Sequence, residues 1–235
     1  MKLTKSLILA VSVLAACVFS ACNSNDDPSD DGQYFLDIVT LESNGDTGAV
    51  LTFRQVDDSP LITLLTNQRF DSGTFKIGER IIVYYHPAGD KRYVSDNVYV
   101  ASANTTFGGG ESYKTASAAE IAAMDSDPIK VQSIWRSGEY LNVVFSGVTS
   151  NEVKNCDLYL NSATKDSASP VLNFIFDGVN GPMAQAYNFY ASFNIGELWN
   201  SLDTENIRVV TTDDTYLGSN TVTIIKKETD IKPIE

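Results

Sequence analysis

Hydrophobic and polar residues alternate in short runs along most of the chain after residue 33. The first five runs span 34–41, 49–54, 61–65, 80–85 and 93–101. They are rich in Val, Ile, Tyr, Phe and Thr and are bounded by Gly, Asn, Asp or Pro, as strands with one buried face are. Asn44-Gly45 lies between the first two runs and favours a hairpin turn there. Five short strands in close succession predict a five-stranded barrel of the OB type over residues 33–104.

The alternation returns after residue 128 and predicts seven more strands. They span 130–136, 140–145, 157–160, 171–176, 187–193, 207–211 and 221–225. Turn residues separate them in the rhythm of an antiparallel β-sandwich. We therefore expect a β-sandwich domain over residues 129–228 and a C-terminal tail over 229–235. Trp135 and Trp199 are expected to pack in its core or at a sheet edge.

Residues 105–128 interrupt the strand pattern and predict a linker with one short helix. The Gly108-Gly109-Gly110 triplet has no periodicity around it, and Tyr113 stands where a dinucleotide-binding loop needs its third glycine. Ser117-Ala118-Ala119-Glu120 has the form of a capping box, which begins a helix. Asp127-Pro128 ends it. The fold class is thus all-β, with a barrel, a sandwich and one short helix between them.

The first 21 residues have the pattern of a secretory leader. Two lysines precede an apolar run of about 13 residues, which is too short to span a bilayer. Cys17 and Cys22 each follow small residues in a way that resembles the bacterial lipobox. We prefer Cys22 as the acylated residue, because polar residues follow it at once, whereas Val18 and Phe19 follow Cys17. Ordinary cleavage without a lipid is the remaining alternative.

The lipid and the charge of the chain limit its location and its partners. Residues 22–32 are acidic, lack apolar side chains and predict a flexible tether. Acyl chains on Cys22 would anchor the protein to a membrane, and we expect the outer membrane. Loss of Lys2 and Lys5 with the leader takes 17 basic residues to 15, against 30 acidic residues, for a formal net charge of −15. Nucleic acid is therefore a poor partner.

The chain lacks the residues that most enzymes need. Once the leader cysteines are set aside, Cys156 is the remaining thiol, so no intrachain disulfide can form, and its alternating surroundings predict a buried structural role. His86 is the single histidine and is expected at the end of a surface strand. No Gly-x-Ser-x-Gly elbow accompanies it. We expect no catalytic, cofactor-binding or metal-binding residues, so the one predicted site is lipidation at Cys22.

Several segments together resemble the NigD-like lipoproteins of Bacteroidetes. These are the lipobox leader, the five-strand N-terminal unit, residues 125–147 (DSDPIKVQSIWRSGEYLNVVFSG) and residues 190–199 (YASFNIGELW). The resemblance covers essentially the whole mature chain. It implies an N-terminal OB domain followed by a C-terminal β-sandwich domain. It supplies no catalytic residue, and it suggests a role in bacteriocin immunity.

Two functions from different classes remain. The preferred hypothesis is a non-enzymatic, membrane-anchored envelope lipoprotein that binds a protein partner. The alternative is a carbohydrate-binding accessory lipoprotein in which Tyr113, Tyr140 or Trp199 stacks on sugar rings. A solvent-facing cluster of coplanar aromatic rings would favour carbohydrate, and an acidic or apolar patch without aromatic residues would favour a protein.

Overall fold

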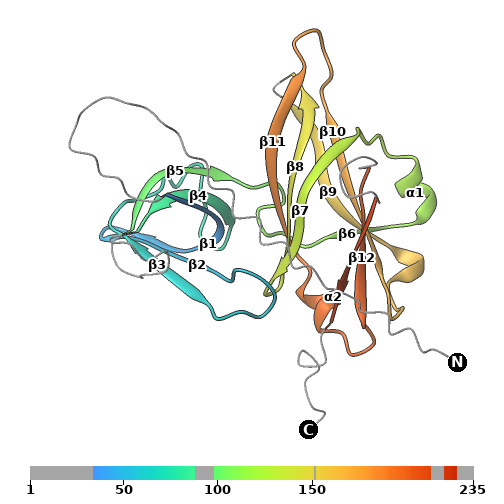
Figure 1. Ribbon diagram of the computed structural model, residues 1–235, viewed down its shortest axis with the longest axis horizontal. Coiled ribbons are helices and arrows are strands. Elements are labelled where there is room, and N and C mark those ends of the chain that lie inside the picture. The colour runs from blue at the N-terminus through green and yellow to red at the C-terminus, as the bar shows by residue number, and fades with distance from the viewer. Residues whose placement is uncertain (1–33, 88–97, 151, 213–219, 227–235) are drawn as a thin grey trace, which may run out of the picture. The chain divides into compact units, whose positions relative to one another are not determined.

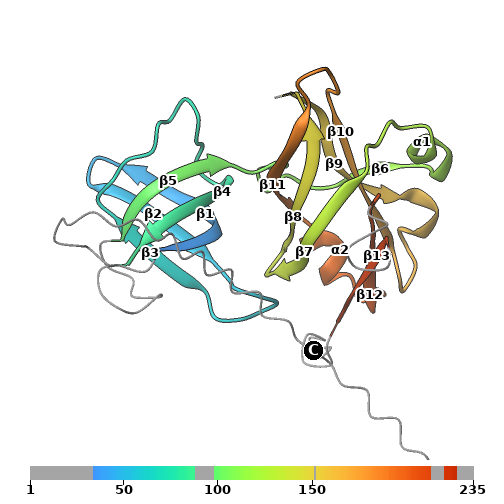
Figure 2. The same ribbon diagram turned by 45° about the horizontal axis from the view of Figure 1, so that its top comes forward.

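The computed structural model describes residues 34–87, 98–150, 152–212 and 220–226 (Figures 1 and 2). It consists mainly of strands, with two short α-helices in the described residues, which confirms the all-β fold class. The leader, the acidic tether, the C-terminal tail and the predicted lipidation site Cys22 lie outside the described residues. None of the helices that the structure describes is long and apolar enough to cross a membrane.

The N-terminal domain is one five-stranded antiparallel sheet. Its strand order is β3-β2-β1-β4-β5. This order is compatible with the predicted five-stranded barrel, because it leaves β3 and β5 as the two edges that would meet on closure. The five strands are β1 (Phe35–Gly45), β2 (Gly48–Phe53), β3 (Ile62–Thr66), β4 (Arg80–His86) and β5 (Tyr99–Thr105).

A side chain joins the two edge strands of this sheet. The backbone N–H of Val98 donates to the carbonyl of Leu65 at 2.8 Å. Gln68 then pairs with Val100 as a backbone would: its amide nitrogen donates to the Val100 carbonyl at 2.9 Å, and its amide oxygen accepts from the Val100 N–H at 2.5 Å. Gln68 therefore continues the pairing of β3 with β5 where no strand ladder does so.

The β1–β2 hairpin turns two residues later than the Asn-Gly pair predicts. Gly45 pairs with Gly48, so Asp46 and Thr47 form the loop, after a register shift between Leu41 and Ser43. Asn44 instead binds the backbone of Phe70. Its amide nitrogen donates to the Phe70 carbonyl, and its amide oxygen accepts from the Phe70 N–H. The turn's positive φ falls at Gly48, where a Cβ would lie 1.9 Å from the Thr66 carbonyl oxygen.

The C-terminal domain is a sandwich of a five-stranded and a three-stranded sheet. The strand orders are β13-β12-β10-β9-β6 and β11-β8-β7, and two pairs, β6 with β9 and β10 with β12, are parallel. The strands are β6 (Lys114–Ala116), β7 (Ile129–Ser137), β8 (Tyr140–Thr149), β9 (Val153–Asn161), β10 (Val171–Gly178), β11 (Gln185–Asn194), β12 (Asn206–Val210) and β13 (Thr221–Ile225).

Aromatic rings fill the space between the two sheets. Phe145 of β8 meets Phe174 and Phe176 of β10 edge to face, with ring centroids 5.1 and 5.2 Å apart. These side chains and Phe193 belong to a core of 18 buried residues that also includes Cys156 and Trp199. The expected burial of Cys156 is confirmed, and of the two tryptophans expected in the core or at a sheet edge, Trp199 packs in this core and Trp135 is half-buried on the edge strand β7. The N-terminal sheet has a separate core.

Two helices and one short strand lie between or after these elements. Helix α1 (Ala118–Ala122) begins at Ser117 with the predicted capping box, and helix α2 (Gly196–Asn200) follows β11. Strand β6 lies in the segment predicted to be a linker, and its three residues show too little alternation to reveal a strand. The fifth strand, expected at 93–101, begins at Tyr99 in the described residues and continues to Thr105. The predicted domain boundaries at 104 and 128 stay predictions.

Replacing Gln68 with leucine tests how the sheet closes. Gln68→Leu would leave the N–H and carbonyl of Val100 without these partners, and an unpaired, partly buried backbone group costs about 1–3 kcal/mol. We expect the free energy of unfolding to fall by about that amount in urea denaturation. Gln185→Leu, at an exposed position, is the control and should change it by less than about 0.5 kcal/mol. Equal stability of the two variants would refute this role.

Candidate binding site at the domain junction

Arg80, the first residue of β4, is buried between the N-terminal sheet and the sandwich. Its side chain is 2% exposed. Towards the sandwich, its Nε donates to Ser192 Oγ at 3.2 Å and its Nη2 to Asn142 Oδ1 at 3.4 Å. Towards its own sheet, the guanidinium donates to Thr40 Oγ1 and to the Ile38 carbonyl at 3.2 and 3.0 Å. One side chain therefore links β1 and β4 to β8 and β11.

In the described part of the chain, all the hydrogen-bond partners of the Arg80 side chain are uncharged. Burial lowers the pKa of Arg80 well below its ordinary value, to about 10, and the Tyr140 hydroxyl opposes this shift. The guanidinium is therefore still protonated at neutral pH. The ring of Tyr140 lies 4.5 Å from the Arg80 Cζ atom, so its π face also stabilises the cation.

A second arginine, which belongs to the sandwich, binds the N-terminal domain. Arg136 at the end of β7 reaches back to the β2–β3 loop, where its two Nη atoms donate to the carboxylate of Asp58 at 2.9 and 2.7 Å. Its Cζ lies 4.2 Å from the ring of Trp199. Asp57 also pairs with the β7 end through two backbone hydrogen bonds, of 2.8 and 2.7 Å. This part of the Asp57-Asp58 loop is thus fixed to the sandwich.

The glycine triplet brings the segment between β5 and β6, which we call the connecting segment (residues 106–113), close to β11. Backbone hydrogen bonds join Phe107 to Tyr190 and Ser192, and join Gly110 to Ser192, at 2.9 Å each. The three glycines all have positive φ. A Cβ on Gly108 would lie 2.5 Å from the Phe193 ring, and one on Gly110 would lie 2.7 Å from Arg80 Cγ. The triplet therefore permits close packing at the junction.

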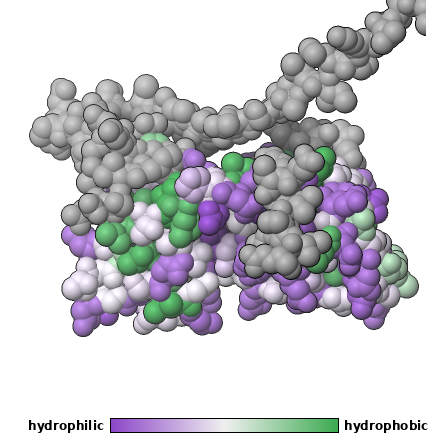
Figure 3. All heavy atoms as spheres, turned by 90° about the horizontal axis from the view of Figure 1, so that it is seen from below, coloured by the Kyte–Doolittle hydropathy of each residue, from purple (hydrophilic) through white to green (hydrophobic). Residues whose placement is uncertain are grey.

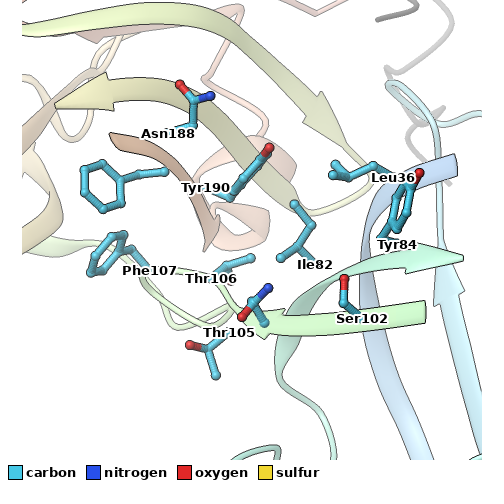
Figure 4. A pocket seen from close by; sticks show the side chains of 11 residues that line it. Leu36, Ile82, Tyr84, Ser102, Thr105, Thr106, Phe107, Asn188 and Tyr190 are labelled. Carbon is cyan, nitrogen blue, oxygen red and sulfur yellow. The ribbon is translucent and has the colours of Figure 1, made fainter. Parts of the chain in front are cut away.

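A cavity of about 370 Å³ opens beside these contacts, and we call it the junction cleft. Figure 4 shows Asn188 and Tyr190 on one side, Ile82, Tyr84 and Ser102 on the other, and Phe107 from the connecting segment beside them. The complete lining is Leu36, Ile82, Tyr84, Ser102, Asn104, Thr105, Thr106, Phe107, Asn188, Phe189 and Tyr190. None of these side chains is charged.

The outer face of the N-terminal sheet carries exposed aromatic residues next to the cleft. The rings of Tyr34 and Tyr84 are stacked with centroids 4.8 Å apart and 17° between their planes, and the ring of His86 meets Tyr34 at 5.4 Å. Tyr99 pairs with His86 across β4 and β5 and is 57% exposed. Leu36, opposite Tyr84, is 45% exposed. We call these five residues the rim patch.

The N-terminal domain also exposes aliphatic side chains outside the rim patch, among them Val56, Leu61 and Ile77. On the face seen in Figure 3, hydrophobic residues are more frequent over the half that contains β1 to β5 than over the sandwich. Exposed apolar residues that lie together, rather than singly, mark interaction surfaces.

The residues proposed from sequence for sugar stacking are not free platforms. Trp199 is 4% exposed and lies under Arg136, with Lys226 Nζ 5.7 Å from its ring. Tyr140 is covered by Arg80. Tyr113 packs against the sandwich core, and burial raises its pKa. Tyr34 and Tyr84 are exposed instead, but they stack on each other, so each ring covers one face of the other.

The reactive side chains considered from sequence lie apart from one another. His86 ends β4, as predicted, and packs against Tyr34. Cys156 is buried in the sandwich core, where desolvation raises its pKa well above the ordinary value. In the described ranges, no three His, Cys, Asp or Glu side chains are grouped so that they could hold a metal ion.

Sequence reasoning missed Arg80 and the residues around it. Arg80 stands at the start of an apolar run, on the same face of β4 as Ile82 and Tyr84. A charged residue in that position was a signal, but its partners Asn142 and Ser192 are 62 and 112 residues away along the chain. Periodicity cannot report contacts of that separation.

Comparison with known proteins agrees with the architecture. Residues 112–225 match the model of the NigD-like C-terminal beta sandwich domain. The sandwich is similar to the C-terminal domain of the NigD-like family. This confirms the resemblance noted in the sequence. A comparison with curated protein sequences gives no match.

Three solved structures share the fold of this chain over most of its length. A protein of unknown function from Bacteroides vulgatus is 17% identical, with a TM-score of 0.57 over 86% of this chain and 95% of its own. A NigD-like immunity protein from Bacteroides caccae is 14% identical, with a TM-score of 0.51 over 82% and 92%. A candidate lipoprotein from Bacteroides fragilis is 10% identical, with a TM-score of 0.52 over 83% and 96%. At these identities the likeness shows the fold alone.

Replacing Arg80 with lysine tests the junction. Lysine keeps the charge but has no planar fork to reach Ser192, Thr40 and Ile38 together, so buried acceptors lose their donors. We expect Arg80→Lys to lower the free energy of unfolding by about 2–4 kcal/mol in chemical denaturation.

The control for this substitution is Arg69→Lys. Arg69 forms a surface ion pair with Asp46 in which the two side chains are 60% and 93% exposed. We therefore expect Arg69→Lys to lower the free energy of unfolding by less than about 0.5 kcal/mol. If Arg80→Lys cost no more than Arg69→Lys, the junction would not depend on the guanidinium.

Proposed function

We propose that this protein is a non-enzymatic lipoprotein of the cell envelope that binds a partner at the junction cleft and the rim patch. The observation that carries the proposal is the cleft itself, an uncharged opening bordered by exposed aromatic residues and placed between two firmly joined domains. Ligand sites commonly lie at domain interfaces.

The state of the reactive side chains supports a non-enzymatic role. The Cys156 thiol is buried and its pKa is raised, so the nucleophilic thiolate is disfavoured. The His86 ring is engaged with Tyr34 in the rim patch, which is a binding surface rather than a catalytic constellation.

The partner that we propose first is a protein. The rim patch matches neither surface set out from the sequence, because it is aromatic but its rings stack on one another instead of lying in one plane. It contains three exposed tyrosines, and tyrosine is enriched in protein interfaces. The similar structure from Bacteroides caccae is a NigD-like immunity protein, so protection against a bacteriocin is one role that such binding would serve.

A second candidate is carbohydrate binding. The specific observation in its favour is the Tyr84 ring, which is solvent-facing and lines the cleft beside uncharged hydrogen-bonding groups, although its stack with Tyr34 is not a coplanar platform.

Anchoring by Cys22 is proposed from the lipobox and is consistent with the candidate lipoprotein among the similar structures. Cys22→Ser should move the protein from the detergent phase to the aqueous phase in detergent phase partitioning and should remove the acylated N-terminal peptide seen by mass spectrometry. The wild-type protein should fractionate with the outer membrane. Cys17→Ser is the control and should leave acylation intact; loss of acylation in Cys17→Ser alone would assign the lipid to Cys17.

A protein partner is tested by capture from envelope fractions after cross-linking. Tyr99→Ala removes the most exposed rim tyrosine, and a tyrosine anchor contributes about 1–2 kcal/mol to an interface, so the partner should be recovered about tenfold less. Leu202→Ala, at a sandwich residue that is 78% exposed, should leave recovery unchanged. Recovery of the same proteins with Tyr99→Ala as with wild type would count against the rim patch as a protein interface.

A further inference from the structure

We propose that the interior of the junction cleft binds an uncharged saccharide unit, with Tyr84 as its stacking platform and Asn188, Asn104 and Ser102 as its hydrogen-bonding groups. This deepens the proposed function and rests on the cleft being the binding site, but not on the existence of a protein partner. The volume of about 370 Å³ lies within the range of small-molecule pockets, roughly 300–1,000 Å³.

The absence of charge in the lining narrows the class of ligand. The eleven lining residues include no acidic or basic side chain. Transfer of a charged ligand group into such a site would not be compensated by an opposite charge. The formal net charge of −15 expected for the mature chain also disfavours phosphate-bearing and acidic ligands. An uncharged ligand therefore fits best.

The polar groups of the lining have unused hydrogen-bonding capacity. Asn188 Oδ1 accepts from Gln132 Nε2 at 2.8 Å and from Ser146 Oγ at 2.6 Å, and these bonds hold the amide with its nitrogen available as a donor. Within the described part of the chain, the side chains of Ser102 and Asn104 make no hydrogen bond of their own. Donors and acceptors thus border the same cavity, as the hydroxyl groups of a sugar require.

Tyr84 supplies the apolar surface that completes such a site. Its ring lines the cleft and the residue is 42% exposed, while the stack with Tyr34 restricts its orientation. Ile82 and Leu36 flank it along the sheet face (Figure 4). A pyranose ring has an apolar C–H face and a hydroxyl edge, so it can pack on an aromatic ring while its hydroxyls meet the amides.

The experiment is an array of neutral and acidic glycans probed with the detergent-solubilised mature protein, followed by calorimetry with the best neutral glycan. We expect neutral glycans to bind. Tyr84→Ala removes the platform, and Asn188→Asp replaces the amide donor by a charged acceptor of the same shape. Each should weaken binding at least tenfold, and Asn188→Asp should keep the wild-type circular dichroism spectrum. Leu202→Ala, at an exposed sandwich residue outside both the cleft and the rim patch, is the control and should bind as wild type does.

Three outcomes would overturn the saccharide assignment: no glycan bound, binding of acidic glycans alone, or wild-type affinity in Asn188→Asp. Capture of a protein that depends on Tyr99, with no glycan bound, would refute the saccharide and leave the protein proposal standing. Glycan binding lost in Asn188→Asp, without any protein captured, would support the saccharide and refute the protein partner. Neither glycan nor protein bound would refute both.

Discussion

The two domains meet around a buried cation whose hydrogen-bond partners are all uncharged. Removing a guanidinium from water costs free energy. This cost is offset because the Arg80 side chain donates hydrogen bonds to four acceptors at once, on Ser192, Asn142, Thr40 and Ile38. Two of these partners belong to the sandwich, so the network is complete only when the domains are docked. Asn142 Nδ2 is buried without a hydrogen-bond partner in the described residues, which adds to the cost of this polar cluster.

The rest of the junction follows from that network. Arg136 makes the reciprocal connection to Asp58, where a bidentate pair and an aromatic face orient its guanidinium. The glycine triplet lets the connecting segment run along β11, because side chains at Gly108 and Gly110 would collide with Phe193 and Arg80. The junction cleft lies where these packed segments diverge, and so its walls come from both domains and are held firmly.

The NigD-like sandwich is thus joined to the N-terminal sheet, and the junction cleft and the rim patch lie beside this joint. The same face of β4 changes character along its length, from Arg80 buried at the junction, through Ile82 in the cleft, to Tyr84 and His86 at the rim patch. A ligand in the cleft would contact both domains. Binding there would therefore add to the contacts that keep the domains together.

The sequence by itself determined the all-β class, the helix with its capping box, the burial of Cys156 and Trp199 and the likeness to the NigD-like family, since these depend on alternation, local caps and motif order. Tertiary structure decided where the hairpin turns, how Gln68 joins β3 to β5, and which aromatic residues are exposed. It also decided the candidate site. Arg80, Asn142 and Ser192 meet across as many as 112 residues, and Tyr84 lines a cleft with Asn188 only because two domains dock. Local pattern carries no information about contacts at such separations, because the free energy that selects them arises only when both surfaces are formed.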